Sequence, residues 1–141
     1  MRDFFKFEKR YKYPHMKPRD VAIWERFIDK YKTAFDTVQY DFNVGDPPPF
    51  DPMGDDGEDL NQDALYRLKI DVIGHMGNTI YIIEVKPNAN SATIGQIEAY
   101  KDIYIRDEVP TKKVIMIIVT DAILPNMKYL CDKKNIQLII V

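Results

Sequence analysis

The stretch "IYIIEVKPN", residues 80–88, decides the fold of this chain. Its β-branched and apolar residues predict a strand that is shielded from water. Glu84 and Lys86 interrupt the strand two residues apart, and side chains at that spacing point to the same face. One face of the strand is therefore expected to pack into the core, and the other face is expected to present the polar side chains of a functional site.

A preceding strand supplies a second carboxylate. Gly77-Asn78 is an accepted two-residue hairpin turn between residues 64–76 and 79–87. Counting outward from this turn places Asp71 directly opposite Glu84, with Cβ atoms about 4.5–5.5 Å apart. The residues that then point to the opposite face, into a core, are Val72, Ile83 and Val85.

Two carboxylates this close repel each other, and burial increases the cost. Three arrangements would relieve the repulsion. Lys86 neutralises one carboxylate in a structural ion pair, or the hairpin lies at an exposed edge, or a divalent metal ion sits between Asp71 and Glu84. Hard oxygen ligands suit Mg²⁺ or Mn²⁺. The local pattern leaves all three open.

The rest of the chain predicts one α/β domain. Apolar residues recur at three- and four-residue steps after Pro18, which indicates a helix. The run "KVIMIIVT" is typical of a central strand covered on both faces. Ser91 is the expected N-cap of a second helix, and Pro125 is expected in the first turn of a third. The predicted order is a helix at 18–31, strands at 35–44, 64–76 and 79–87, a helix at 91–107, a strand at 113–120, a helix at 122–135 and a strand at 136–141.

Composition favours a cytoplasmic globular protein. The net charge of −2 over 141 residues gives no general attraction to nucleic acid or anionic lipid. The lone Cys131 excludes an internal disulfide and a multi-cysteine metal site. Neither a signal peptide nor an apolar run of about 20 residues, the length that spans a bilayer, is visible, so no membrane association is expected.

Charge is nevertheless unevenly distributed. Residues 1–19 hold seven Lys/Arg and two acids, and they are interpreted as a basic, aromatic arm ahead of a single domain at 20–141. Alternating aromatics and bases suit nucleic-acid phosphates and unpaired bases, but they also suit a strand or arm lying on the domain or on a partner. Residues 45–63 are an acidic, Pro-rich loop insertion, and one hypothesis is that this loop limits the entry of duplex DNA.

"IDVIG" followed by "IIEVK" resembles the PD-(D/E)xK nuclease superfamily, in which an aspartate on one strand and E-x-K on the next form a metal-dependent phosphodiesterase site. "GQIEAY", with Gln96 and Tyr100 four residues apart, is similar to the Q-x-x-x-Y element of the RecB-like branch. The resemblance covers about residues 20–141, and its diagnostic part is 71–100. It implies a restriction-endonuclease-like core, a mixed central sheet flanked by helices in the order αβββαβαβ. The single cysteine departs from the iron–sulfur members of that branch, and the usual basic surface is missing.

The resemblance also implies roles for individual residues. Asp71, Glu84 and the carbonyl of Val85 would hold one or two Mg²⁺ or Mn²⁺ ions. Lys86 would orient or deprotonate the attacking water and offset charge on the phosphate. Gln96 would position Lys86 or a phosphate oxygen, and Tyr100 would contact the backbone or only pack. Many members carry a glutamate on the first helix, and Glu25 stands in the corresponding place.

The leading functional expectation is a small metal-dependent deoxyribonuclease whose partner is single- or double-stranded DNA. One alternative is a catalytically silent binding or assembly protein with the nuclease fold, for example a phage or defence-system component. Another is a junction-resolving endonuclease, which would need a homodimer and a basic platform. A homo-oligomer or a protein partner fits the near-neutral charge.

Overall fold

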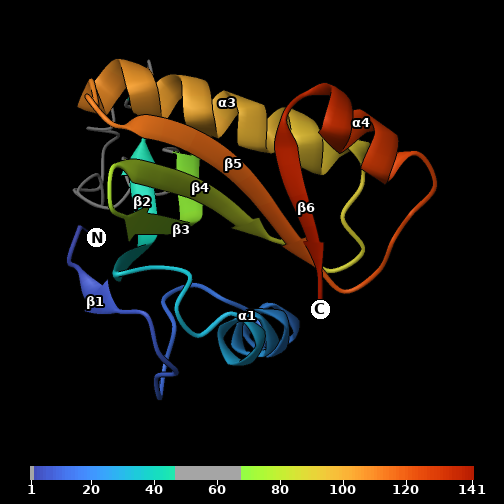
Figure 1. Cartoon of the computed structure of the whole chain (residues 1–141), viewed down its shortest axis with the longest axis horizontal. Coiled ribbons are helices and arrows are strands. Elements are labelled where there is room, and N and C mark those ends of the chain that lie inside the picture. Colours follow the sequence, from blue (N-terminus) through green and yellow to red (C-terminus); the bar gives the residue numbers. More distant parts are fainter. Residues whose placement is uncertain (1, 47–67) are drawn as a thin grey trace, which may run out of the picture.

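The computed structural model describes residues 2–46 and 68–141, and within them the chain forms a mixed six-stranded sheet with three helices (Figure 1). Spatial order follows chain order, β1-β2-β3-β4-β5-β6, with antiparallel pairs from β1 to β4 and parallel pairs from β4 to β6. The strands are β1 (Phe5–Lys6), β2 (Thr37–Val44), β3 (Leu68–Met76), β4 (Thr79–Val85), β5 (Lys113–Thr120) and β6 (Ile136–Ile140). The helices are α1 (Pro18–Lys30), α3 (Ser91–Glu108) and α4 (Met127–Lys133). The predicted α/β class is confirmed, and β1 is added to the predicted order.

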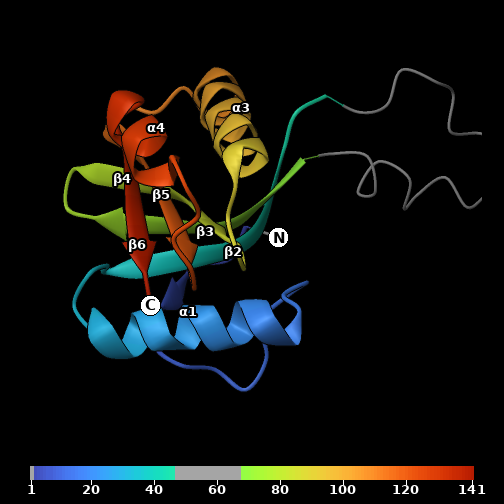
Figure 2. The ribbon, with the colours of Figure 1, turned by 90° about the vertical axis from the view of Figure 1, so that its right-hand side faces the viewer.

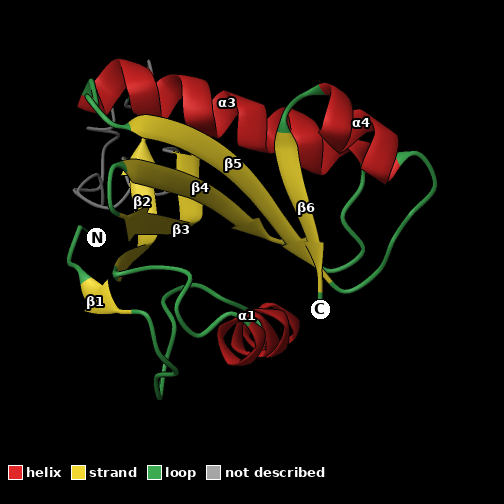
Figure 3. Ribbon diagram, in the orientation of Figure 1, coloured by secondary structure: helices red, strands yellow, loops and turns green. Residues whose placement is uncertain are grey.

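Helices cover both faces of the sheet. In Figures 1 and 3, α3 and α4 lie on one face and α1 lies on the other, and the turned view in Figure 2 shows the same layers. Parallel neighbours need a crossover connection, and α3 and α4 supply the two that link β4 to β5 and β5 to β6. The core is accordingly in two parts. The α1-side core includes Trp24, Phe27, Val72, Ile83 and Val119, and the α3-side core includes Ile70, Ile82, Ile97, Ile118 and Cys131.

The hairpin at the centre of the sheet forms in the predicted register. Met76 pairs with Thr79 across the turn, and the pairing continues outward to Val72 and Ile83. Gly77 has φ +56°, a left-handed conformation that glycine adopts at little cost. The expected core residues Val72, Ile83 and Val85 are all buried on the α1 side.

β2 bends where a regular strand was predicted. Asp41 has φ +51°, which is uncommon for any residue other than glycine. Tyr40 pairs with Val72 and Phe42 pairs with Ile70, so the register is kept on both sides of the bend. However, Tyr40 packs into the α1-side core, whereas Phe42 packs into the α3-side core. Simple alternation along a strand would place both side chains on the same face. The bend therefore turns the side chains after Asp41 toward the opposite face of the sheet.

Element ends differ from the prediction at both later helices. Asn90, not Ser91, caps α3: its Oδ1 accepts a hydrogen bond of 3.0 Å from the Ala92 N–H. Pro125 lies before α4 rather than in its first turn, because Asn126 at the N-cap is left-handed with φ +70°. The acidic loop, apart from residues 45 and 46, and the predicted strand residues 64–67 lie outside the described residues.

The basic N-terminal arm packs on the α1 side. Phe7 contacts the rings of Trp24, Phe27 and Phe35, and β1 pairs with the start of β2. The Tyr13 side chain is also buried in the α1-side core. The strand-like interpretation of the arm thus describes its first part. Within the described residues no helix is long and apolar enough to cross a membrane.

Candidate functional site

Five of the residues predicted for the site line one cavity of about 520 Å³. They are Asp71 on β3, Glu84 and Val85 on β4, Lys86 just after β4 and Gln96 on α3. The opposite wall is the start of α1, which adds Lys17, Arg19 and Asp20. The cavity therefore lies where the end of the hairpin meets the first turns of two helices. It brings together acids and bases from β3, from the end of β4 and from the start of α1, and α3 adds the amide of Gln96.

The centre of the site is a pair of carboxyl groups. Glu84 is only 5% exposed, and its pKa is raised to about 11, first by burial and then by the hydrogen bond and charge of Asp71. Burial also raises the pKa of Asp71, although hydrogen bonds from Glu84 and from the Val85 N–H oppose that rise. At neutral pH, without a cation, Glu84 thus keeps its proton in the hydrogen bond between the two carboxyl groups.

The backbone fixes this pair in place. The Val85 N–H donates to Oδ2 of Asp71 at 2.9 Å. Beyond the last β3–β4 pair, Val72 and Ile83, this side-chain oxygen thus accepts a hydrogen bond from the β4 backbone. The Lys86 N–H donates to the Val119 carbonyl at 2.9 Å, which holds the end of β4 against β5. One oxygen of the pair remains unused: Oε2 of Glu84 is buried and has no hydrogen-bond partner among the described residues. A buried acceptor without a partner costs about 1–3 kcal/mol, so this oxygen points to a ligand.

Lys86 and Gln96 approach the pair from the exposed side. The charge of Lys86 lowers the pKa of both carboxyl groups, but burial outweighs it. Gln96 donates from Nε2 to the Tyr100 hydroxyl at 2.7 Å, one turn further along α3. Burial, and then the charge of Glu84, raises the pKa of Tyr100 to about 12, so Tyr100 is a neutral phenol close to the acids. Tyr100 thus holds the Gln96 side chain through this hydrogen bond, and Tyr100 itself does not line the cavity.

The acid that α1 contributes to this cavity is Asp20 rather than Glu25. Glu25 lies further along α1, where it accepts a hydrogen bond of 2.9 Å from the Tyr13 hydroxyl and does not line the cavity. Asp20 lines it, and its charge raises the pKa of both Asp71 and Glu84. Sequence reasoning missed Asp20 because an acid in the first turn of a helix is explained by capping. It does also cap: Oδ2 accepts the Lys17 N–H at 3.1 Å.

A small polar network holds the loop after Lys86. Asp121, directly after β5, accepts the Asn88 N–H at 2.9 Å and pairs with Arg19 at 2.8 Å. Thr120 accepts the Ala89 N–H through Oγ1 at 3.1 Å. These contacts join the loop, the end of β5 and the start of α1. The walls of the cavity are thus fixed to one another.

The residues present fit a divalent cation. Mg²⁺ is usually bound through one or two carboxylates and keeps several waters, and the buried pair offers two carboxylates with one unpartnered oxygen. Within residues 2–46 and 68–141 no group of three or more His, Cys, Asp and Glu side chains is gathered as ligands. Water and main-chain oxygens such as the Val85 carbonyl would complete the coordination shell.

A larger hollow of about 870 Å³ lies along β5, β6 and α4. Asp132 is the one acid in its lining, and Asp132 pairs with Lys128 at 2.9 Å. The smaller cavity is therefore the better candidate for chemistry, because among the described residues it sets the buried Glu84 and the partly buried Asp71 beside bases. Comparison with protein-family models, with curated proteins and with solved structures found no match for this chain.

Proposed function

We propose that this protein is a divalent-metal-dependent phosphodiesterase that hydrolyses DNA, built on the restriction-endonuclease-like fold of the PD-(D/E)xK superfamily. The order of the elements supports the fold. A helix, an antiparallel three-stranded meander, a crossover helix and two parallel strands joined by a helix follow one another from α1 to β6. This is the arrangement that the resemblance of residues 71–100 implies.

One observation carries the proposed activity. Glu84 is buried against Asp71 in a cavity wall, and its Oε2 has no partner in the described part of the chain. Two carboxyl groups enclosed together are costly unless a proton or a cation lies between them. Lys86 at the exposed side is a base placed to meet an anionic substrate, which a purely structural pair would not need.

The chain's own residues would divide the work as follows. Asp71, Glu84 and the Val85 carbonyl would hold Mg²⁺ or Mn²⁺, which when bound supplies a Lewis acid and lowers the pKa of a coordinated water. Lys86 would donate to a phosphate oxygen and offset the negative charge that develops there. Gln96, held by Tyr100, keeps its side-chain oxygen available to orient Lys86 or the attacking water. Asp20 would attract the cation from the α1 side.

Cleavage of labelled single- and double-stranded DNA in Mg²⁺ and in Mn²⁺ tests the proposal. Wild-type protein should cut, and Glu84→Gln and Lys86→Ala should each lower the rate about 100-fold or more, because a metal ligand and a charge-stabilising base are removed. Asp132→Asn and Lys133→Ala are the matched controls. Both residues are exposed on α4 outside this cavity, so these variants should cut like wild type.

Two results would overturn the proposal. The first is an absence of cutting with either metal, and the second is equal cutting by wild type and Glu84→Gln. DNA binding without cutting would favour the catalytically silent binding protein instead.

A further inference from the structure

We infer that the second half of the N-terminal arm, residues 9–19, is a track that leads a single strand of nucleic acid into the cavity at Glu84. This deepens the proposed function, on which its catalytic part rests, by naming the substrate class as an unpaired strand. The binding surface itself stands on separate observations of charge, exposure and continuity.

The charge of this segment has one sign. Residues 9–19, "KRYKYPHMKPR", contain five Lys/Arg and no acid. Some of these bases are engaged elsewhere: Lys9 pairs with Asp29 and Arg19 pairs with Asp121, both at 2.8 Å. Lys12 and Lys17 are exposed and form no ion pair with any described residue. Two cations thus remain on the arm for phosphates.

Tyr11 stands fully out in solvent between two anchored residues. Its relative exposure is 105%, whereas Tyr13 is 5% exposed. The Tyr13 hydroxyl accepts the Arg10 N–H and donates to Glu25, both at 2.9 Å, and the Arg10 guanidinium lies 3.8 Å from the Phe5 ring centroid. The backbone on both sides of Tyr11 is therefore held, and an aromatic ring presented in this way can stack on a base.

The track is continuous with the site. Lys17 and Arg19 line the same cavity as Asp71 and Glu84. Five residue steps separate Lys12 from Lys17, so their Cα atoms are at most about 18 Å apart at 3.6 Å per residue. A strand of a few nucleotides is therefore long enough to reach from Lys12 to the cavity wall at Lys17. Figures 1 and 2 place the arm and α1 on the same side of the sheet.

An unpaired strand fits this surface better than a duplex does. Stacking on Tyr11 needs a base with an exposed face, and the bases within a duplex are covered by their neighbours. A cavity of about 520 Å³ is in the range that encloses a drug-sized molecule, which is the size of a nucleotide. Few unpaired cations are available, whereas binding to a duplex depends mainly on many phosphate contacts.

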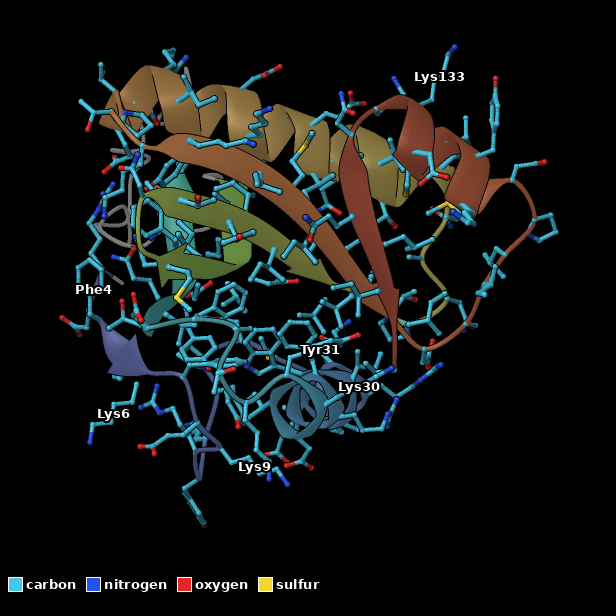
Figure 4. All side chains as sticks on the ribbon, in the orientation of Figure 1. Phe4, Lys6, Lys9, Lys30, Tyr31 and Lys133 are labelled. Carbon is cyan, nitrogen blue, oxygen red and sulfur yellow. The ribbon has the colours of Figure 1, made fainter. Side chains whose placement is uncertain are left out.

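Fluorescence anisotropy with labelled twelve-nucleotide oligo-dT, in EDTA so that no cutting occurs, tests the inference. Tyr11→Ala and Lys12→Ala should each raise the Kd about fivefold or more. Lys12→Ala should also reduce the slope of log K against log salt by about 0.7. The matched controls are Tyr129→Ala and Lys133→Ala on α4, both exposed and remote from the arm, and Figure 4 shows Lys133 at the opposite end of the molecule. They should leave the Kd unchanged.

The outcomes separate this inference from the proposed nuclease. Equal weakening of oligo-dT and oligo-U binding by the arm variants supports it, because both strands offer phosphates and stacking faces. Tighter binding of a twelve-base-pair duplex than of oligo-dT would overturn it, as would arm variants that bind like wild type. A protein that binds strands through Tyr11 and Lys12 yet cuts nothing overturns only the proposed activity. A protein that cuts normally after both arm substitutions overturns only the track.

Discussion

Replacing Glu84 with glutamine should change how stability depends on pH, and the structure gives the size of the effect. The ordinary pKa of 4.5 is raised to about 11 in the folded chain, mainly by burial. Folding favours the protonated form of Glu84. The contribution of Glu84 to the free energy of unfolding is therefore fully present below pH 4.5 and is lost as pH rises toward 11. Glu84 is only 5% exposed, so solvent screening does not reduce this loss appreciably. Each pH unit within the window costs about 1.4 kcal/mol, which amounts to about 4 kcal/mol between pH 5 and pH 8.

Urea unfolding in EDTA, followed by the fluorescence of the fully buried Trp24, measures this directly because the chain has a single tryptophan. Wild type should lose about 4 kcal/mol of unfolding free energy from pH 5 to pH 8, and Glu84→Gln should lose far less because glutamine does not titrate. Saturating Mg²⁺ should flatten the wild-type profile, since a cation stabilises the ionised pair. Identical profiles for the two proteins would refute the assignment of a protonated, buried Glu84.

Three further predictions concern α1, α3 and β3. Asp20→Asn should raise the Mn²⁺ concentration that gives half-maximal cutting about fivefold, because about 1 kcal/mol of attraction is lost. Glu25→Gln on the same helix should leave that concentration unchanged, and a larger effect of Glu25→Gln in a Mn²⁺ titration would contradict the geometry. Gln96→Ala should slow cutting about tenfold or more with a change in unfolding free energy below about 1 kcal/mol, as measured by parallel rates and urea curves; an unaltered rate would remove Gln96 from the site. Gly74→Ala should destabilise the fold by about 1–3 kcal/mol in urea, because the added Cβ would lie 2.7 Å from the Phe35 ring, and unchanged stability would show that the ring moves aside.

The hairpin was predictable because short-range chemistry sets its register. The turn at Gly77-Asn78 fixes which residues face each other, and a slip by one residue would bury Asp71 and Glu84 among apolar side chains. The predicted juxtaposition of these acids with Lys86 needed both this turn and the two-residue period of side chains along β4. Gln96 joined them because the connection from β4 to α3 is short, which leaves little freedom in where the helix begins.

The missed features depend on contacts between distant segments. Asp20 enters the cavity only because α1 packs across the sheet with its first turn toward the hairpin end, and nothing near Asp20 in the sequence indicates this. The bend at Asp41 lies within a run of residues typical of a regular strand, so the sequence did not reveal it. Asp41 has a left-handed φ of +51°, and the residues on its two sides, Tyr40 and Phe42, pack into different cores. The burial of Phe7 depends on the aromatic cluster around Trp24, to which residues from 7 to 35 contribute.

The central claim is that the buried Asp71–Glu84 pair is built to hold a divalent cation. Calorimetric titration of Mn²⁺ at pH 7.5, in two buffers of different ionisation enthalpy, tests it most directly. Wild type should bind saturably and release about one proton per site, because the cation displaces the proton that Glu84 keeps at this pH. Glu84→Gln should bind at least tenfold more weakly and release none. Equal binding by both proteins, or no binding by the wild type, would contradict the claim.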